Sequence, residues 1–249
     1  MVIPGLEFSL YRGEIHILGY GFTRRIRMSV RVSTGIQGLD NILLGGLIAR
    51  RTYLVYGEPG TGKTTVGLHF LSAGVSIGET ALMIAFSQPE DHIRADARSI
   101  GLNVSSVKIL DLTAPPEAFA ENESYDFFAP AEVEREFMTA QISKEIGDGR
   151  PARIFVDSLG QFRSLAMDDF HHRRLVQSFF RFATLQGATV IAASDEGEYA
   201  RDVDGVIQLE FAQLNRTIRI VKFRGSDFQA GYHPMRLTSS GLKIPLTAA

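Results

Sequence analysis

The sequence predicts an α/β protein with a mostly parallel central sheet, flanked by helices and ending in a C-terminal β-hairpin. Apolar runs typical of strands alternate with segments of helical length, as in doubly wound folds with right-handed crossovers. The run at residues 80–86 is almost continuously apolar, which is typical of a central parallel strand. Residues 235–238 and 242–244 are joined by a Ser-Ser-Gly turn and predict the closing hairpin.

The composition is that of a globular chain, for which we expect the cytoplasm. The 249 residues allow one large domain or two small ones, and 45% hydrophobic content is enough to bury a full core. No apolar run approaches the roughly 18 residues of a membrane span, and no signal-peptide pattern begins the chain. The lack of cysteine excludes disulfides, thiolate zinc sites and cysteine nucleophiles. A net charge of −2 argues against a chain built to coat nucleic acid.

A nucleotide-binding motif follows the predicted strand Thr52–Tyr56. The next nine residues read GEPGTGKTT and match G-x-x-x-x-G-K-T, the P-loop signature. Glycines let the backbone turn so that N–H groups point at a phosphate, and a helix starting near Lys63 adds its positive end. Lys63 should reach the β- and γ-phosphates of ATP, and the Thr64 hydroxyl should ligate Mg²⁺. The predicted ATP-binding residues are Gly57, Glu58, Pro59, Gly60, Thr61, Gly62, Lys63, Thr64 and Thr65.

A second acidic signal ends the predicted strand Arg153–Asp157. An aspartate at the carboxyl end of a central strand can hold Mg²⁺ through its water shell, opposite the P-loop. The alternative is that Asp157 caps the next turn. Because the P-loop lies upstream, we assign the magnesium site to Thr64 and Asp157.

Three further stretches resemble the KaiC-like branch of the RecA superfamily of ATPases. They are STGIQGLD at residues 33–40, LLGGL at residues 43–47 and KFRG at residues 222–225, and the resemblance runs from Ser33 to Ile244. It implies a single RecA-like P-loop NTPase domain over residues 33–249. Residues 1–32 are then an N-terminal extension of uncertain order, containing a short strand at residues 15–18. Its basic cluster could serve a partner- or nucleic-acid-binding arm; otherwise it is a weakly ordered extension, or precedes a start at Met28.

The hydrolytic residues depart from the family pattern. KaiC-like proteins usually place two adjacent glutamates after the second strand, whereas residues 86–91 here read FSQPED. Ser87 and Gln88 therefore stand where the acids would be. Gln88 can orient a water molecule but is a poor proton acceptor, so we expect slow hydrolysis. Ser87 and Glu90 fit a capping box of a helix running to about Ser99, which predicts that Glu90 is a capping residue rather than a displaced base.

Lys222 and Arg224 are the remaining catalytic candidates. The resemblance implies that this pair reaches ATP bound to the neighbouring subunit, so that the site is completed only in a ring or filament of identical chains. The alternative is two charges on the exposed face of an edge strand.

Three functions are compatible with these motifs. The first is an oligomeric, slow Mg²⁺-dependent ATPase whose nucleotide state changes its contacts with regulatory protein partners. The second is a recombinase-type DNA-binding ATPase, which we disfavour because the loop at residues 195–204 carries five acids and one arginine. The third is a non-hydrolysing ATP-sensing scaffold, which keeps the P-loop without the catalytic acids.

Overall fold

The computed structural model describes residues 7–11, 14–19, 22–27, 30–114, 131–212 and 215–245 of the chain. Residues 115–130 lie outside these ranges. Contacts divide the chain into two units, Met1–Arg31 and Val32–Ala249. The first unit is a three-stranded antiparallel sheet of order β1-β2-β3. Its strands are β1 (Glu7–Tyr11), β2 (Glu14–Gly19), which contains the predicted strand at residues 15–18, and β3 (Phe22–Arg27).

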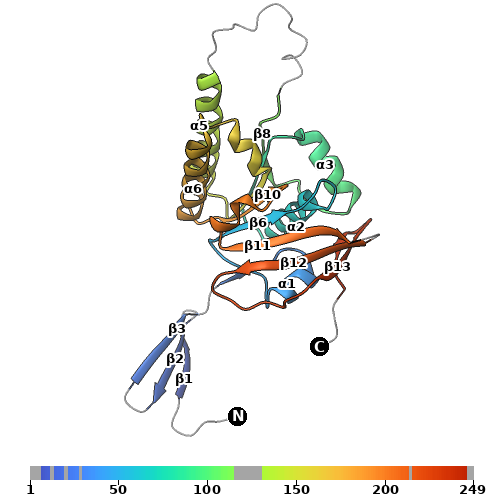
Figure 1. Ribbon diagram of the computed structural model, residues 1–249. Coiled ribbons are helices and arrows are strands. Elements are labelled where there is room, and N and C mark those ends of the chain that lie inside the picture. The colour runs from blue at the N-terminus through green and yellow to red at the C-terminus, as the bar shows by residue number, and fades with distance from the viewer. Residues whose placement is uncertain are drawn as a thin grey trace, which may run out of the picture. The chain divides into compact units, whose positions relative to one another are not determined.

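The second unit is built on a nine-stranded sheet of order β14-β13-β12-β11-β6-β10-β9-β7-β8 (Figure 1). Neighbours from β8 to β11 are parallel, while β12, β13 and β14 continue the sheet in antiparallel pairs. The parallel strands are β6 (Thr52–Tyr56), β7 (Ala81–Ala85), β8 (Lys108–Asp111), β9 (Arg153–Asp157), β10 (Thr189–Ser194) and β11 (Gly205–Ala212). The antiparallel strands are β12 (Asn215–Phe223), β13 (His233–Thr238) and β14 (Gly241–Lys243).

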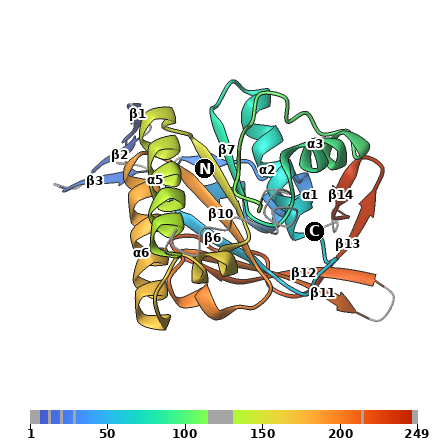
Figure 2. The ribbon, with the colours of Figure 1, turned by 90° about the horizontal axis from the view of Figure 1, so that it is seen from above.

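Helices cover the two faces of this sheet, with one apolar core on each side (Figure 2). One core takes apolar side chains from α1 (Gln37–Ile42), α2 (Lys63–Ser76) and α3 (Glu90–Ser99). The other takes them from α5 (Ala131–Gly149), η1 (Leu159–Arg163) and α6 (Asp169–Leu185). The remaining elements are η2 (Glu198–Arg201) and a small sheet of β4 (Arg31–Val32) and β5 (Leu47–Ile48).

The predicted architecture is confirmed, including the closing hairpin, which is formed by β13 and β14. No helix in the described part of the chain is long and apolar enough to cross a membrane. The edge-strand alternative for Lys222 and Arg224 is not excluded. Among the described residues, β13 pairs with β12 only at residues 216–218, and at Lys222 the strand is paired with β11 alone.

One local prediction was wrong, the capping box of α3. Pro89 occupies the N-cap position without a side-chain cap, and the Asp111 carboxylate accepts a hydrogen bond from the Glu90 N–H at 2.9 Å. The Glu90 side chain instead pairs with Arg94 one turn along the helix, at 2.7 Å. The cap therefore comes from the end of the neighbouring strand β8, which no local sequence pattern contains.

Candidate nucleotide-binding site

The phosphate loop, residues 57–62, connects β6 to α2 as the motif predicts. Gly62 is the N-cap of α2 and has a φ of 109°, a left-handed conformation that favours glycine. Gly57 is fixed by packing, because a Cβ there would lie 2.1 Å from the carbonyl oxygen of Leu209 in β11. Thr61 is fully buried, and its hydroxyl donates to the Glu58 carbonyl at 2.8 Å. The loop is thus held by its own bonds and by the neighbouring strand.

Lys63 lies back over this loop. Its Nζ donates to the carbonyl oxygens of Gly57 at 2.6 Å and Glu58 at 3.1 Å. The same ammonium forms an ion pair with the Asp195 carboxylate at 2.9 Å. Only 10% of the Lys63 side chain is exposed, against 68% for Asp195. The ammonium therefore stands at the centre of the loop, with an exposed carboxylate as its charged partner.

Thr64 and Asp157 meet as the sequence predicts. The Thr64 hydroxyl donates to Oδ2 of Asp157 at 2.6 Å, joining the start of α2 to the carboxyl end of β9. Burial raises the pKa of Asp157; the Thr64 hydrogen bond and the Lys63 charge oppose this shift, and the Asp195 charge adds to it. A hydroxyl and a carboxylate are hard oxygen ligands, which suit Mg²⁺ with water and phosphate completing its shell. The residues present therefore fit a magnesium ion beside the phosphate loop.

Gln88 is directed elsewhere. Its side-chain Nε2 donates to the Asp96 carboxylate of α3 at 2.6 Å. Phe86, two residues earlier, lies beside the end of β9, because the Phe86 N–H donates to the Asp157 carbonyl oxygen at 3.0 Å. The backbone therefore approaches the predicted catalytic position, whereas the Gln88 amide is committed to α3.

Lys222 and Arg224 lie away from the phosphate loop of their own chain. Lys222 is level with Val206 and through it with Leu54, the middle residue of β6, while the loop begins only after Tyr56, where β6 ends. The Lys222 Nζ donates to the carbonyl oxygens of Ala200 at 2.7 Å and Val203 at 2.6 Å. The structure thus does not bring this pair to Lys63 within one protomer.

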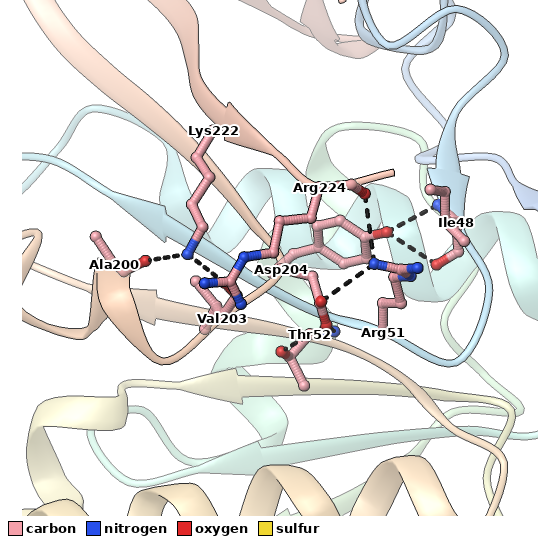
Figure 3. A network of polar contacts seen from close by, with 9 residues as sticks. Ile48, Arg51, Thr52, Ala200, Val203, Asp204, Lys222 and Arg224 are labelled. Atoms are coloured by element: carbon pink, nitrogen blue, oxygen red, sulfur yellow. Dashed lines mark hydrogen bonds and ion pairs between the residues drawn. The ribbon is translucent and has the colours of Figure 1, made fainter. Parts of the chain in front are cut away.

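Asp204 ties the strand ends around Lys222 together. Its carboxylate pairs with Arg51 at 3.2 Å and accepts from the N–H of Thr52, also at 3.2 Å. The Arg224 N–H donates to the Asp204 carbonyl oxygen at 2.9 Å. Figure 3 shows these contacts converging between β6, β12 and the segment that precedes β11. This end of the sheet is therefore closed by charged side chains that bind backbone groups.

Two residues near the phosphate loop escaped the sequence analysis. Asp195 entered it only as one acid among several in a loop, although it follows β10 directly and carboxyl ends of parallel strands share one edge. Arg216 of β12 donates to the Gly60 carbonyl oxygen from Nε at 3.3 Å and Nη2 at 3.2 Å. The signal that could have found Arg216 is the antiparallel pairing of β12 with β11, because this pairing places Arg216 beyond the end of β6, beside the loop.

The fold and the site together define a P-loop domain of the RecA-like class. The chain belongs to the KaiC ATPase family: residues 32–248 match the family model described as ATPase: KaiC. A UPF0273 protein of Methanopyrus kandleri is 27% identical over 86% of this chain and 91% of its own length. A UPF0273 protein of Pyrococcus horikoshii is 28% identical, covering 87% and 94% respectively.

A relative with a functional name is the circadian clock oscillator protein KaiC of Thermostichus vulcanus. It is 28% identical over 88% of this chain but only 45% of its own length. The chain therefore spans most of the UPF0273 proteins and less than half of the clock protein.

Proposed function

We propose that this protein binds Mg²⁺-ATP, hydrolyses it slowly, and acts as an oligomer whose nucleotide state controls its contacts with other proteins. The observation that carries the proposal is the 2.6 Å contact between Thr64 and Asp157, made beside the phosphate loop that holds Lys63. In P-loop proteins, a nucleoside triphosphate and its metal ion bind where the P-loop threonine lies beside an aspartate at the end of a strand.

Each residue of the site has a distinct task in this proposal. Lys63 binds the β- and γ-phosphates. To do so, its ammonium gives up its contacts with the Gly57 and Glu58 carbonyl oxygens and with the Asp195 carboxylate. Thr64 and Asp157 would hold Mg²⁺, which when bound neutralises charge on the phosphates. The N–H groups at the start of α2 face the same anion, with the positive end of the helix dipole behind them.

Slow turnover follows from what stands in the place of the paired glutamates. Gln88 is bound to Asp96 and has no basic atom, so it accepts no proton from a water molecule. The same observation supports the second candidate, a non-hydrolysing ATP sensor. The two functions differ only in turnover, and steady-state hydrolysis measured beside nucleotide affinity separates them.

Oligomer formation is supported by the distance of Lys222 and Arg224 from their own phosphate loop along the sheet. In this proposal the exposed Arg224 approaches the nucleotide of a neighbouring subunit, and Lys222 fixes the strand end that presents it.

Assembly is tested by light scattering of the wild type with and without Mg²⁺-ATP. We expect growth to a ring or filament with ATP, and weakened growth in Arg224→Ala. Arg236→Ala, an exposed arginine of β13, is the matched control. A strict monomer under both conditions would contradict the oligomeric part of the proposal.

Nucleotide binding is tested by calorimetry on Lys63→Ala. Removing the Lys63 ammonium from the phosphate loop should weaken Mg²⁺-ATP binding on the order of 10²- to 10⁴-fold, since breaking a buried charge pair costs about 3–5 kcal/mol. The fold should persist, because the Lys63 ammonium contacts the phosphate loop and the exposed Asp195 carboxylate rather than the apolar core. Lys144→Ala, an exposed lysine of α5, is the control. Unchanged affinity in Lys63→Ala would refute the site.

A further inference from the structure

The site as described lacks a proton acceptor for hydrolysis. Gln88 is committed to Asp96, and Glu90, the nearest acid in sequence, is paired with Arg94. Asp157 accepts the Thr64 hydrogen bond and belongs to the magnesium position. A carboxylate that faces the phosphate position must therefore come from another element, if the chain is to activate water.

Asp195 is such a carboxylate. Its Oδ1 lies 2.9 Å from the Nζ of Lys63, the atom that reaches the β- and γ-phosphates in a P-loop. Its charge also acts on Asp157, whose pKa it helps to raise, so the Asp195 carboxylate lies within electrostatic range of the magnesium position. Lys63 and Asp157 lie on either side of the place where a γ-phosphate would bind, and the Asp195 carboxylate contacts Lys63 there.

The backbone holds Asp195 in this place independently of the ion pair. Ser194 ends β10, and its carbonyl oxygen accepts from the Gly57 N–H at 3.3 Å, at the first residue of the phosphate loop. Further along the same segment, Lys222 binds the carbonyl oxygens of Ala200 and Val203. Both flanks of the segment are therefore anchored, while the Asp195 side chain is 68% exposed and accessible to water.

We propose that Asp195 is the catalytic carboxylate of this ATPase, a role that rests on the proposed function. Asp195 is paired with Lys63 until ATP binds. When ATP enters, the γ-phosphate takes the Lys63 ammonium, and repulsion between the two anions turns the carboxylate to a water molecule beside the phosphate. Water oxygen then bonds to the γ-phosphorus as the bond to the β,γ-bridging oxygen breaks. The water proton passes to Asp195, and the electron pair leaves with ADP.

The proposal predicts opposite effects on binding and turnover when the charge is removed. Asp195→Asn keeps the shape of the side chain but neither competes as an anion for Lys63 nor accepts a proton. Its affinity for Mg²⁺-ATP should equal that of the wild type or exceed it several-fold, while kcat should fall about 10²- to 10⁴-fold, as on loss of a general base. Asp195→Glu should retain part of the wild-type kcat.

The experiment measures the dissociation constant by calorimetry and kcat at saturating Mg²⁺-ATP, using the full chain. Glu196→Gln is the matched control: Glu196 is the adjacent exposed acid, and both values should stay within two-fold of the wild type. If Asp195→Asn fails to fold by circular dichroism, Asp195→Ser takes its place.

Four outcomes would overturn the proposal. Wild-type kcat in Asp195→Asn would show that the carboxylate is idle, while leaving the proposed ATPase standing. Equal loss of binding and turnover would show a structural role. A wild-type protein that binds Mg²⁺-ATP without hydrolysing it would remove both the catalytic role and the ATPase function. Absent ATP binding would instead refute the proposed function at its base.

Discussion

Two lysines of the second unit make the same kind of contact in different surroundings. The Lys63 ammonium donates to the carbonyl oxygens of Gly57 and Glu58, and the Lys222 ammonium to those of Ala200 and Val203. Lys63 also has the exposed Asp195 carboxylate as a partner. Burial, with the Arg224 charge as a second cause, lowers the pKa of Lys222, while Asp204 and Asp202 oppose the shift.

The difference between the two lysines separates a ligand site from a structural clamp. The carbonyls under Lys63 lie in the phosphate loop, so an incoming anion can take over the ammonium. The carbonyls under Lys222 belong to a segment that contains η2 and is tied to β6 by the Asp204 contacts. Each lysine thus donates to two carbonyl oxygens, but the pair at Lys63 lies in a ligand site and the pair at Lys222 stabilises the fold.

The largest expected contrast is therefore in stability. Lys222→Ala leaves two carbonyl oxygens without their charged donor, and hydrogen bonds to charged groups contribute about 1.5–3 kcal/mol each. We expect the free energy of unfolding in urea to fall by at least about 1.5 kcal/mol, with Mg²⁺-ATP affinity of the protomer within two-fold of the wild type. A stable Lys222→Ala protein with weak ATP binding would reverse the comparison between the two lysines.

A smaller effect is expected at Gln88. In Gln88→Glu the 2.6 Å hydrogen bond to Asp96 is replaced by two carboxylates that repel each other. This repulsion should move the new glutamate away from α3 and toward the phosphate position. Steady-state turnover should rise by a few-fold at saturating Mg²⁺-ATP.

The double variant Gln88→Glu with Asp96→Asn is the control for this effect. The asparagine amide can donate to the new glutamate and hold it on α3, so turnover should return to the wild-type value. Equal gains in the single and double variants would show that Asp96 does not control this side chain.

The smallest effect concerns a contact that involves neither lysine. The buried Nε2 of His69 in α2 accepts from the Leu242 N–H at 2.9 Å, which ties the phosphate-loop helix to the C-terminal hairpin. Burial lowers the pKa of His69, partly opposed by the Gly35 backbone. Because the unfolded chain takes up this proton near pH 6.5, the free energy of unfolding should fall as pH drops below that value.

Urea unfolding between pH 7.5 and pH 5 measures this fall, whose slope cannot exceed about 1.4 kcal/mol per pH unit for one proton. His69→Gln keeps an acceptor that does not titrate and should flatten the curve, whereas the exposed His92→Asn should not. Burial also lowers the pKa of His172, so part of the slope should remain in His69→Gln. An unchanged slope in that variant would show that His69 does not cause the loss.

The sequence was sufficient where a short segment dictates its own geometry. The contact between Thr64 and Asp157 follows from a loop, a helix start and a strand end, each of which is visible as a local pattern. The parallel direction of the central strands follows from their alternation with helices, and the hairpin from its turn residues.

The sequence was insufficient where partners come from distant segments. The placement of α3 decides whether Gln88 faces the phosphate or Asp96, and the end of β8 supplies the cap that Ser87 was expected to provide. Asp195 was counted only as a charge, because its distance from Lys63 depends on how far β10 extends beside β6. Side-chain choice among several nearby partners is a tertiary property, and residue spacing does not encode it.

The glycines of the phosphate motif carry different information about descent. Gly57 is demanded by the Leu209 carbonyl oxygen, whereas a Cβ at Gly60 would meet nothing closer than 3.8 Å and one at Gly62 nothing closer than 3.6 Å. A descendant that stopped binding nucleotide would still need Gly57 to close its sheet. Its lysine and its later glycines would be free to drift, apart from their backbone angles. In a relative that has lost part of the motif, a glycine at the position of Gly57 would then show only that the strands still pair as they do here. A lysine at the position of Lys63 would show that the relative still binds the nucleotide.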